Sequence, residues 1–175
     1  MNLPNSATGP RRFRFALFLL SVAAVCLASS AQTKPPSRLP DFQFKLTDGK
    51  VVKSSDLGGK IVIVEFWGTW CKPCLAEIPD FNSFYDQYKG KGVLLLALAV
   101  DSGPEDRVRE AAKRLGIQYP VAAPALSDLD VFGDISVVPT TWIVDRTGKV
   151  RKVLYGSAPE KVEAVREIVD RLLKD

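Results

Sequence analysis

Apolar residues repeat with two different spacings from residue 41 onward. The runs 61–67 and 93–100 are apolar on both faces, which is typical of strands in the middle of a sheet. Shorter runs surround two glycine-containing turns, and each pair of runs is predicted to form a hairpin. These hairpin strands are residues 42–46 with 51–52, and residues 141–144 with 150–154.

Four stretches between these strands carry apolar residues at helical spacing. The first begins at Cys71 and ends near Gly90, and Pro79 inside it is expected to bend the helix. The other three are residues 104–116, 126–132 and 159–173. Strands and helices in this order predict an α/β fold, in which a mixed central sheet has helices on both faces and an N-terminal β-hairpin as an extension.

The first forty residues differ from the rest of the chain. Three arginines precede an uncharged apolar run at residues 15–28 that ends in small residues, which is the layout of a secretory signal. We expect residues 1–31 to be a signal peptide, residues 32–40 a proline-rich linker, and residues 41–175 the single folded domain. An uncleaved membrane anchor is the alternative, although the run is shorter than the roughly 20 apolar residues that cross a bilayer comfortably. In both cases the domain is expected in the periplasm or outside the cell.

Charge and metal-ligand composition exclude several function classes. The 24 basic residues outnumber the 20 acidic ones, but removal of residues 1–31 takes away three arginines and no acid, which leaves 21 against 20. No clustered basic stretch indicates nucleic-acid binding. The chain has no histidine, and Cys71 and Cys74 would be the cysteines left after cleavage. We therefore expect neither a structural zinc site, which needs four such ligands, nor the tight copper site of a non-enzymatic copper carrier.

The two remaining cysteines form the motif Cys71-Lys72-Pro73-Cys74 between a buried strand and a helix. On a helix their sulfur atoms would lie nearly one turn apart, close enough to form a disulfide. The helix N-terminus and the motif residues Lys72 and Pro73 are expected to lower the pKa of the Cys71 thiol, which makes Cys71 the nucleophile. Cys74, more sheltered in the helix, would resolve the mixed disulfide. A permanent structural disulfide is the alternative, but such a short loop would stabilise the fold poorly.

The segment Val64–Cys74 resembles the active-site segment of the thioredoxin superfamily, and in particular its TlpA/ResA/CcmG-like branch, with AhpC/TSA and Redoxin-like neighbours. The resemblance covers most of residues 41–175, including the stretch from Val138 to Thr141. It implies a thioredoxin-like fold and an enzyme that exchanges disulfides with proteins. It also implies that Pro139 follows a cis peptide bond and faces the Cys pair, which would leave Val138 free to pair with a substrate peptide.

Two carboxylates could accept the proton that Cys74 must lose. Glu65 interrupts an apolar strand and matches the buried acid of thioredoxins, so burial is expected to raise its pKa toward neutrality. Glu77 lies three residues after Cys74 on the same helix face, where similar cytochrome-maturation reductases carry an acid. Either glutamate could instead be solvated. Beside the nucleophile, Trp70 is expected to shape the substrate groove.

The resemblance favours a monomeric reductase with no cofactor beyond the redox-active Cys71–Cys74 disulfide. Its expected partners are disulfide-bearing proteins, apocytochrome c first among them, and a membrane thiol-disulfide electron donor, in cytochrome c biogenesis and cell redox homeostasis. An oxidant of folding proteins would use the same chemistry in the opposite direction. A thiol peroxidase is a further alternative, for which Cys71 would form a sulfenic acid, but the chain lacks a Pro-x-x-x-Thr-x-x-Cys segment.

Overall fold

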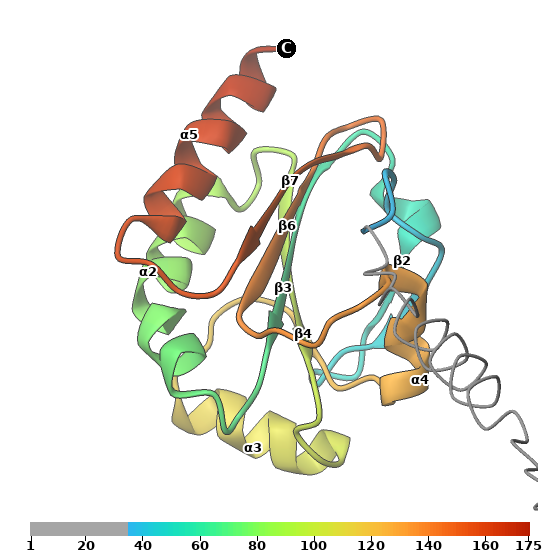
Figure 1. Ribbon diagram of the computed structural model, residues 1–175, viewed down its shortest axis with the longest axis vertical. Coiled ribbons are helices and arrows are strands. Elements are labelled where there is room, and N and C mark those ends of the chain that lie inside the picture. The colour runs from blue at the N-terminus through green and yellow to red at the C-terminus, as the bar shows by residue number, and fades with distance from the viewer. Residues whose placement is uncertain (1–34) are drawn as a thin grey trace, which may run out of the picture. The chain divides into compact units, whose positions relative to one another are not determined.

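The computed structural model describes residues 35–175, which belong to one compact unit (Figure 1). The predicted signal peptide and the first linker residues lie outside the described residues. The strands are β1 (Gln43–Lys45), β2 (Val51–Lys53), β3 (Ile61–Trp67), β4 (Val93–Ala99), β5 (Val121–Ala122), β6 (Thr140–Val144) and β7 (Val150–Tyr155). The helical segments are η1 (Ser54–Leu57), α2 (Lys72–Tyr88), α3 (Glu105–Arg114), α4 (Leu126–Leu129), η2 (Asp130–Phe132) and α5 (Lys161–Lys174).

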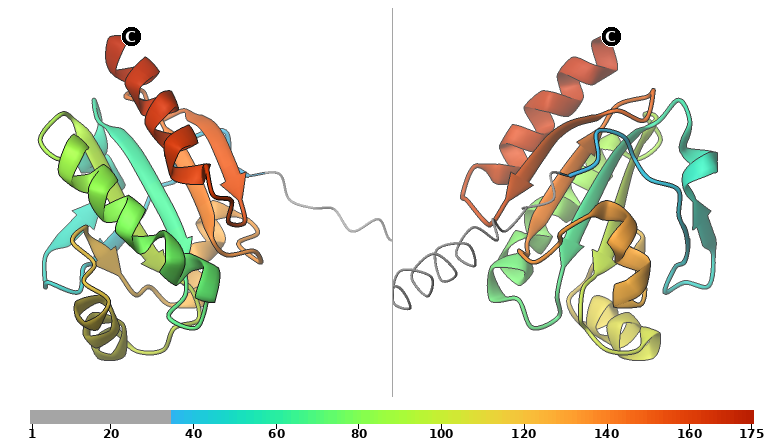
Figure 2. Two further views of the ribbon diagram at one scale, coloured as in Figure 1. Left: turned by 90° about the vertical axis from the view of Figure 1, so that its left-hand side faces the viewer. Right: turned by 45° about the vertical axis from the view of Figure 1, so that its right-hand side comes forward.

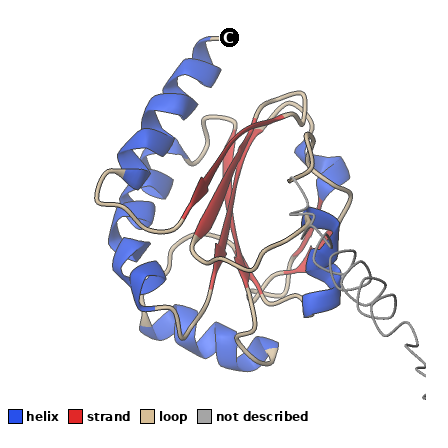
Figure 3. Ribbon diagram, in the orientation of Figure 1, coloured by secondary structure: helices blue, strands red, loops and turns tan. Residues whose placement is uncertain are grey.

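The central sheet has the strand order β5-β4-β3-β6-β7. Figure 3 shows its strands between the helices. β3 pairs in parallel with β4 and antiparallel with β6, while β4 pairs in parallel with β5, and β6 and β7 form an antiparallel hairpin. Every residue of the central strand β3 is buried, as its apolar pattern predicted. The predicted mixed sheet is confirmed. The two-residue strand β5 was not predicted, because Val121 and Ala122 are too short a run to show a spacing.

Both faces of the sheet are covered, as the sequence predicted. The long helices α2 and α5 lie side by side across one face (Figure 2), and α3 packs against the same hydrophobic cluster. Because the chain steps from β3 to β4 to β5 in one direction, right-handed crossovers place α2 and α3 on the same side. The N-terminal hairpin of β1 and β2, with η1, α4 and η2, covers the other face around a cluster of aromatic rings. These rings belong to Phe44, Phe66, Phe132 and Trp142.

The last residues of the predicted linker are attached to the hairpin of β6 and β7. The N–H of Val150 donates to the carbonyl of Ser37 at 2.9 Å, and the N–H of Leu39 donates to the carbonyl of Gly148 at 2.8 Å. The linker residues involved lie between two prolines and retain their own N–H groups, which permits this pairing. The folded domain therefore includes residues that composition assigned to the linker.

Helix α2 holds the Cys motif against the sheet. It begins directly after Cys71 and continues through Pro79 to Tyr88. Its buried side chains, at positions 74, 77, 78, 81, 84 and 88, lie on one face, so this face of the helix packs on the sheet from its first turn to its last. Within residues 35–175, no helix is both long and apolar enough to cross a membrane.

Candidate active site around the Cys71–Cys74 disulfide

The Cys motif joins the end of β3 to the start of α2. Cys71 is the N-cap of α2, and Pro73 lies in the first turn, where proline is tolerated because no intrahelical donor is needed. Cys71 and Cys74 form a disulfide with an S–S distance of 2.10 Å and a Cα–Cα distance of 5.3 Å. The backbone N–H of Cys74 donates to Cys71 Sγ at 3.2 Å. The helix N-terminus thus offers the sulfur of Cys71 a hydrogen-bond donor and the positive end of the helix dipole.

Both cysteines are buried in this oxidised form. Cys71 is 4% exposed and Cys74 is 5% exposed, so exposure in the disulfide does not distinguish Cys74 as the more sheltered residue. The two sulfurs differ instead in position, because only that of Cys71 accepts a hydrogen bond from the helix N-terminus. Lys72 and Pro73, which separate the cysteines, are both exposed. Lys72 therefore places a positive charge beside Cys71 at the surface.

Trp70 forms an exposed aromatic surface next to Cys71. It is 58% exposed, and its indole N–H donates to the carbonyl of Asp101 at 3.0 Å. The ring lies over Gly68, where an added Cβ atom would approach the indole to 2.8 Å. The position of this ring therefore depends on the absence of a side chain at Gly68 and on the loop that follows β4.

Gly68→Ala is expected to displace the Trp70 indole, because the new methyl group would overlap the ring. We expect a shifted tryptophan emission spectrum and a loss of about 1–3 kcal/mol in the free energy of unfolding. Gly58→Ala is the matched control, since nothing lies within 4 Å of the position of its Cβ. An emission spectrum of Gly68→Ala that matches the control would contradict this placement of the indole.

The peptide bond between Val138 and Pro139 is cis, as the resemblance implied. Pro139 immediately precedes β6, and its carbonyl accepts a hydrogen bond from the N–H of Gly156 at 2.8 Å. Val138 is half-buried and packs against the core cluster that contains both cysteines. The fold therefore brings this loop, from a distant part of the sequence, to the same cluster as the Cys motif.

A buried ion cluster lies on the sheet face that α2 covers. Glu65 on β3, Glu77 on α2 and Lys161 at the start of α5 meet there, with side chains that are 4%, 7% and 3% exposed. Lys161 Nζ lies 3.3 Å from Glu65 Oε1 and 2.9 Å from Glu77 Oε2. The hydroxyl of Thr141 donates to Glu65 Oε2. The structure thus brings the two candidate glutamates together through one lysine, and neither glutamate is solvated.

Two buried polar atoms in this region have no hydrogen-bond partner among the described residues. They are Glu77 Oε1 and Trp67 Nε1. The side chains of Glu65 and Trp67 lie on the same face of β3, because alternate residues of a strand do so. Because Glu77 Oε1 has no partner, this oxygen can accept a proton while the other oxygen of Glu77 binds Lys161.

Burial dominates the ionisation of Glu65. Removal from water raises the pKa of Glu65 to about 7, the negative charge of Glu77 adds to the increase, and Lys161 and the Thr141 hydroxyl oppose it. The pKa of Tyr119 is raised as well, because the phenol is buried and faces the charges of both glutamates. Glu65 therefore changes its protonation state near neutral pH, as its position in an apolar strand predicted.

Sequence reasoning missed Lys161 and Thr141. Lys161 stands four residues before Val165, on the apolar face of the last helix. A lysine at such a position indicates that its charge is buried and pairs with a buried acid, so the sequence did contain this signal. Thr141 is directly opposite Glu65 in the register of β3 and β6, which could be known only after the strands were paired.

Comparison with known proteins identifies the family of the chain. Residues 36–153 match the AhpC/TSA family. The thiol-disulfide oxidoreductase ResA of Geobacillus thermodenitrificans is 35% identical over 144 residues, which cover 82% of this chain and 77% of the relative. The protein of the same name from Bacillus subtilis is 37% identical over 127 residues, which cover 72% of this chain and 70% of the relative.

Solved structures show the same fold. A thiol:disulfide interchange protein DsbE from Chlorobium tepidum has a TM-score of 0.70 and 29% identity, over 80% of this chain and 98% of that one. A protein disulfide isomerase from Bacteroides thetaiotaomicron has a TM-score of 0.73 and 27% identity, over 81% of this chain and 91% of that one. The thioredoxin-like fold is confirmed. The chain belongs to the AhpC/TSA family, and within it to the thioredoxin-like thiol-disulfide oxidoreductases.

Proposed function

We propose that the protein is an extracytoplasmic reductase of protein disulfides that acts in cytochrome c maturation, with apocytochrome c as its leading substrate. A membrane thiol-disulfide carrier would return electrons to the Cys71–Cys74 pair. The observation that carries the chemistry is the disulfide at the start of α2, where Cys71 Sγ accepts the hydrogen bond of the helix N-terminus. The names of the relatives, thiol-disulfide oxidoreductase and thiol:disulfide interchange protein, support the exchange chemistry. The direction of electron flow is proposed from the resemblance to the ResA- and CcmG-like branch.

In the proposed cycle both cysteines begin as thiols. The Cys71 thiolate attacks one sulfur of the substrate disulfide, which forms a mixed disulfide and releases the other substrate sulfur as a thiolate that takes up a proton. Cys74 then loses its proton and attacks Cys71 Sγ, which releases the second substrate sulfur. The substrate disulfide has gained two electrons, and the Cys71–Cys74 pair has lost them to form its own disulfide.

The proton of Cys74 needs an acceptor, and the buried ion cluster supplies two carboxylates. Glu77 follows Cys74 by three residues on α2 and has one oxygen without a partner among residues 35–175. Glu65 is ionised or protonated in comparable amounts near pH 7 because its pKa is about 7, which suits an acid-base group at that pH. We assign proton exchange with Cys74 to this pair, with Glu65 as the group that sets the pH dependence.

Trp70 and Val138 are the proposed substrate contacts. Trp70 is the exposed aromatic surface beside Cys71, and Val138 lies in the loop before β6 that packs on the same core cluster as the cysteines. An extended substrate segment could pair with the backbone of Val138 while its disulfide meets Cys71.

The reduction potential of the Cys pair tests the proposed direction. We expect a value near that of thioredoxin, about −270 mV, when the purified protein is equilibrated with glutathione or dithiothreitol buffers. A value near about −120 mV, typical of a strong oxidant, would overturn the reductase and favour an oxidant of folding proteins. Rapid turnover of hydrogen peroxide by the same sample would instead favour a thiol peroxidase.

Glu65→Gln is expected to slow the second step and to leave the first unchanged. The amide cannot accept a proton, so release of the substrate from the mixed disulfide should be about a hundredfold slower at pH 7. The pH profile of this step should lose its inflection near pH 7, because that inflection belongs to Glu65. Single-turnover kinetics from pH 5 to pH 9 would measure both steps. Glu167→Gln, at an exposed position on α5, is the control, and an inflection that persists in Glu65→Gln would contradict the assignment.

A further inference from the structure

Lys161 occupies a position that its own helix does not favour. It is the first residue of α5, directly after the N-cap Glu160, and its side chain is 3% exposed. A cation at a helix N-terminus faces the positive end of the helix dipole, and a fully buried lysine is rare unless it is paired. The side chain is therefore held by groups outside α5, and the structure shows two carboxylates that hold it.

The two carboxylates differ in the oxygens that remain open to a proton. Both oxygens of Glu65 are in use, because Oε1 accepts from Lys161 at 3.3 Å and Oε2 accepts from the Thr141 hydroxyl. Glu77 accepts from Lys161 at 2.9 Å through Oε2, while its Oε1 has no partner among residues 35–175. Glu77 also lies three positions after Cys74 on the buried face of α2. Glu77 Oε1 is therefore the oxygen of the pair that is placed to take a proton.

Within the described part of the chain, Lys161 is the one cation in ion-pair contact with either glutamate. The sheet neighbours of Glu65 are uncharged, and the titratable groups nearest to it on this face are a carboxylate, a phenol and the two cysteine sulfurs. These neighbours and groups are Ala97 on β4, Thr141 on β6, Tyr119 before β5, and Cys71, Cys74 and Glu77 at α2. Lys161 therefore offsets the negative charge of the pair alone.

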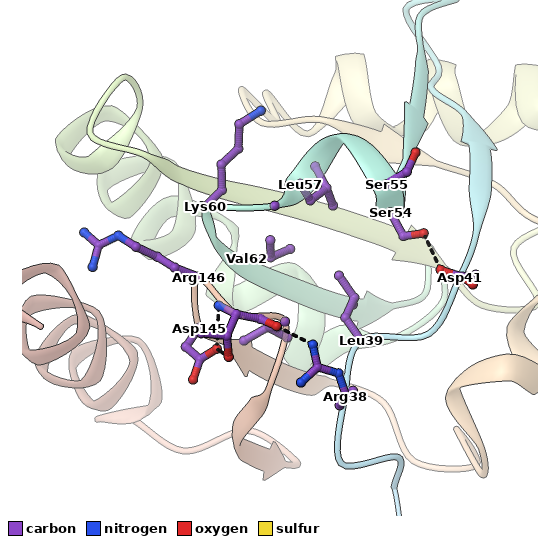
Figure 4. Close-up of a pocket in the computed structure, with 14 residues that line it drawn as sticks. Arg38, Leu39, Asp41, Ser54, Ser55, Leu57, Lys60, Val62, Asp145 and Arg146 are labelled. Carbon is purple, nitrogen blue, oxygen red and sulfur yellow. Dashed lines mark hydrogen bonds between the residues drawn. The ribbon is translucent and has the colours of Figure 1, made fainter.

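The charged residues at the start of β3 lie away from this cluster. Figure 4 shows a cavity of about 220 Å³ there, and Lys60, Asp145 and Arg146 are among the residues that line it. The β3 residue that lines this cavity is Val62, which packs in the core cluster on the other face of the sheet from Glu65. Glu65 follows Val62 by three residues, a distance of about 10 Å along the strand.

We propose that Lys161 is a positioning residue for the step in which Cys74 resolves the mixed disulfide. The inference rests on the proposed function, but not on which protein is the substrate. The ammonium group binds one oxygen of each glutamate, so Glu77 Oε1 stays open and the charge of Glu65 acts on Glu77 through the shared lysine. When Glu65 is ionised, two carboxylates share one cation, and Glu77 is the stronger base. When Glu65 is protonated, Lys161 serves Glu77 alone and weakens it as a base.

The step is balanced in atoms and electrons. The proton of Cys74 passes from Sγ to Glu77 Oε1, and the electron pair left on Cys74 Sγ forms the bond to Cys71 Sγ. The bond between Cys71 Sγ and the substrate sulfur breaks, and the substrate leaves as a thiolate with that electron pair. Lys161 forms and breaks no covalent bond in this step, so its part is to hold the two carboxylates and to set their charge.

Titration of the Glu65 carboxyl group tests the shared lysine without any substrate. The carbon-13 signal of labelled glutamate would be followed in the oxidised protein from pH 5 to pH 9, and its absence in Glu65→Gln would assign it. Lys161→Met is expected to move the inflection of Glu65 upward from about pH 7 by about one pH unit or more, because a contacting opposite charge is lost. Glu77→Gln is expected to move it downward, because the charge of Glu77 raises the pKa of Glu65.

The rate of the resolving step tests the positioning role itself. The reduced protein would react with a small aromatic disulfide, from which attack by Cys71 releases one coloured thiolate and attack by Cys74 releases the second. The second release should show an inflection near pH 7 in the parent protein. In Lys161→Met it should be at least about fivefold slower at pH 7, with the inflection moved upward as in the titration. The first release should keep its rate, because Cys71 depends on the start of α2.

Lys174→Met is the matched control, because Lys174 lies at the exposed end of the same helix, and it should keep the rates and the inflection of the parent. A parent protein that releases only the first thiolate would overturn the proposed function, and the positioning role with it. If the parent releases both, an unmoved inflection in Lys161→Met would overturn the positioning role alone. Should Lys161→Met fail to fold at neutral pH, the titration of Glu77→Gln decides, and an inflection of Glu65 that does not fall would overturn the role.

Discussion

Cys74→Ser is expected to hold substrate proteins as mixed disulfides through Cys71, whereas Cys71→Ser is expected to hold none. Without Cys74 the first attack still proceeds, but no second thiol is placed to displace the substrate. Catalytic turnover of a protein disulfide should fall by about a thousandfold or more in both variants. Non-reducing electrophoresis of extracts from cells that produce each variant, followed by mass spectrometry of the trapped species, would reveal both the difference and the substrates.

The two variants control for each other, because each retains a single thiol of the motif. The comparison is needed since Cys71 and Cys74 are almost equally buried in the disulfide, so exposure does not assign their roles. The assignment rests on the hydrogen bond that Cys71 Sγ accepts at the helix N-terminus. Equal trapping by Cys71→Ser would show that this position does not select the attacking sulfur.

The fold could be predicted from the sequence because its signals are local. The long apolar runs of β3 and β4 and the helical spacing of α2, α3 and α5 fixed the order of the main elements, and the two turns with glycine marked both hairpins. β5 escaped prediction because it has two residues and its pairing partner lies in β4. The proline-rich composition assigned Ser37 and Leu39 to a linker. Their pairing could not be predicted, because their hydrogen bonds go to residues near Gly148, more than a hundred positions away.

Only part of the candidate site could be predicted from the sequence. The Cys motif and the burial of Glu65 could be predicted, since a charged residue inside a strand that is apolar on both faces is expected to be buried with it. The ion cluster could not, because Lys161 is separated from Glu77 by 84 positions and from Glu65 by 96. Only the packing of α5 beside α2 brings these groups together.

Lys161→Met is expected to destabilise the protein strongly at alkaline pH and only slightly at acid pH. The substitution leaves two buried carboxylates without their cation, and breaking a buried ion pair in this way costs about 3–5 kcal/mol. Loss of Lys161 should raise the pKa of Glu65 above its present value of about 7, because the lysine lowers it. Between the ordinary pKa of 4.5 and the raised one, the folded protein binds more protons than the unfolded protein, so its stability falls as the pH rises. Urea unfolding at pH 5 and pH 8 would measure the difference.

Removal of one carboxylate should relieve part of this loss. In the double variant Lys161→Met with Glu77→Gln, one buried charge remains instead of two, so the stability at pH 8 should lie between those of the parent and of Lys161→Met. Lys152→Met, at an exposed position on β7, is the control and should change the free energy of unfolding by less than about 0.5 kcal/mol at either pH. The double variant matters because a lysine that merely filled space would not be rescued by a change at Glu77. Lys161→Met could instead lower the free energy of unfolding equally at pH 5 and pH 8, with no relief from Glu77→Gln. That result would mean that Lys161 contributes its hydrocarbon chain to the core and not its charge to the two carboxylates.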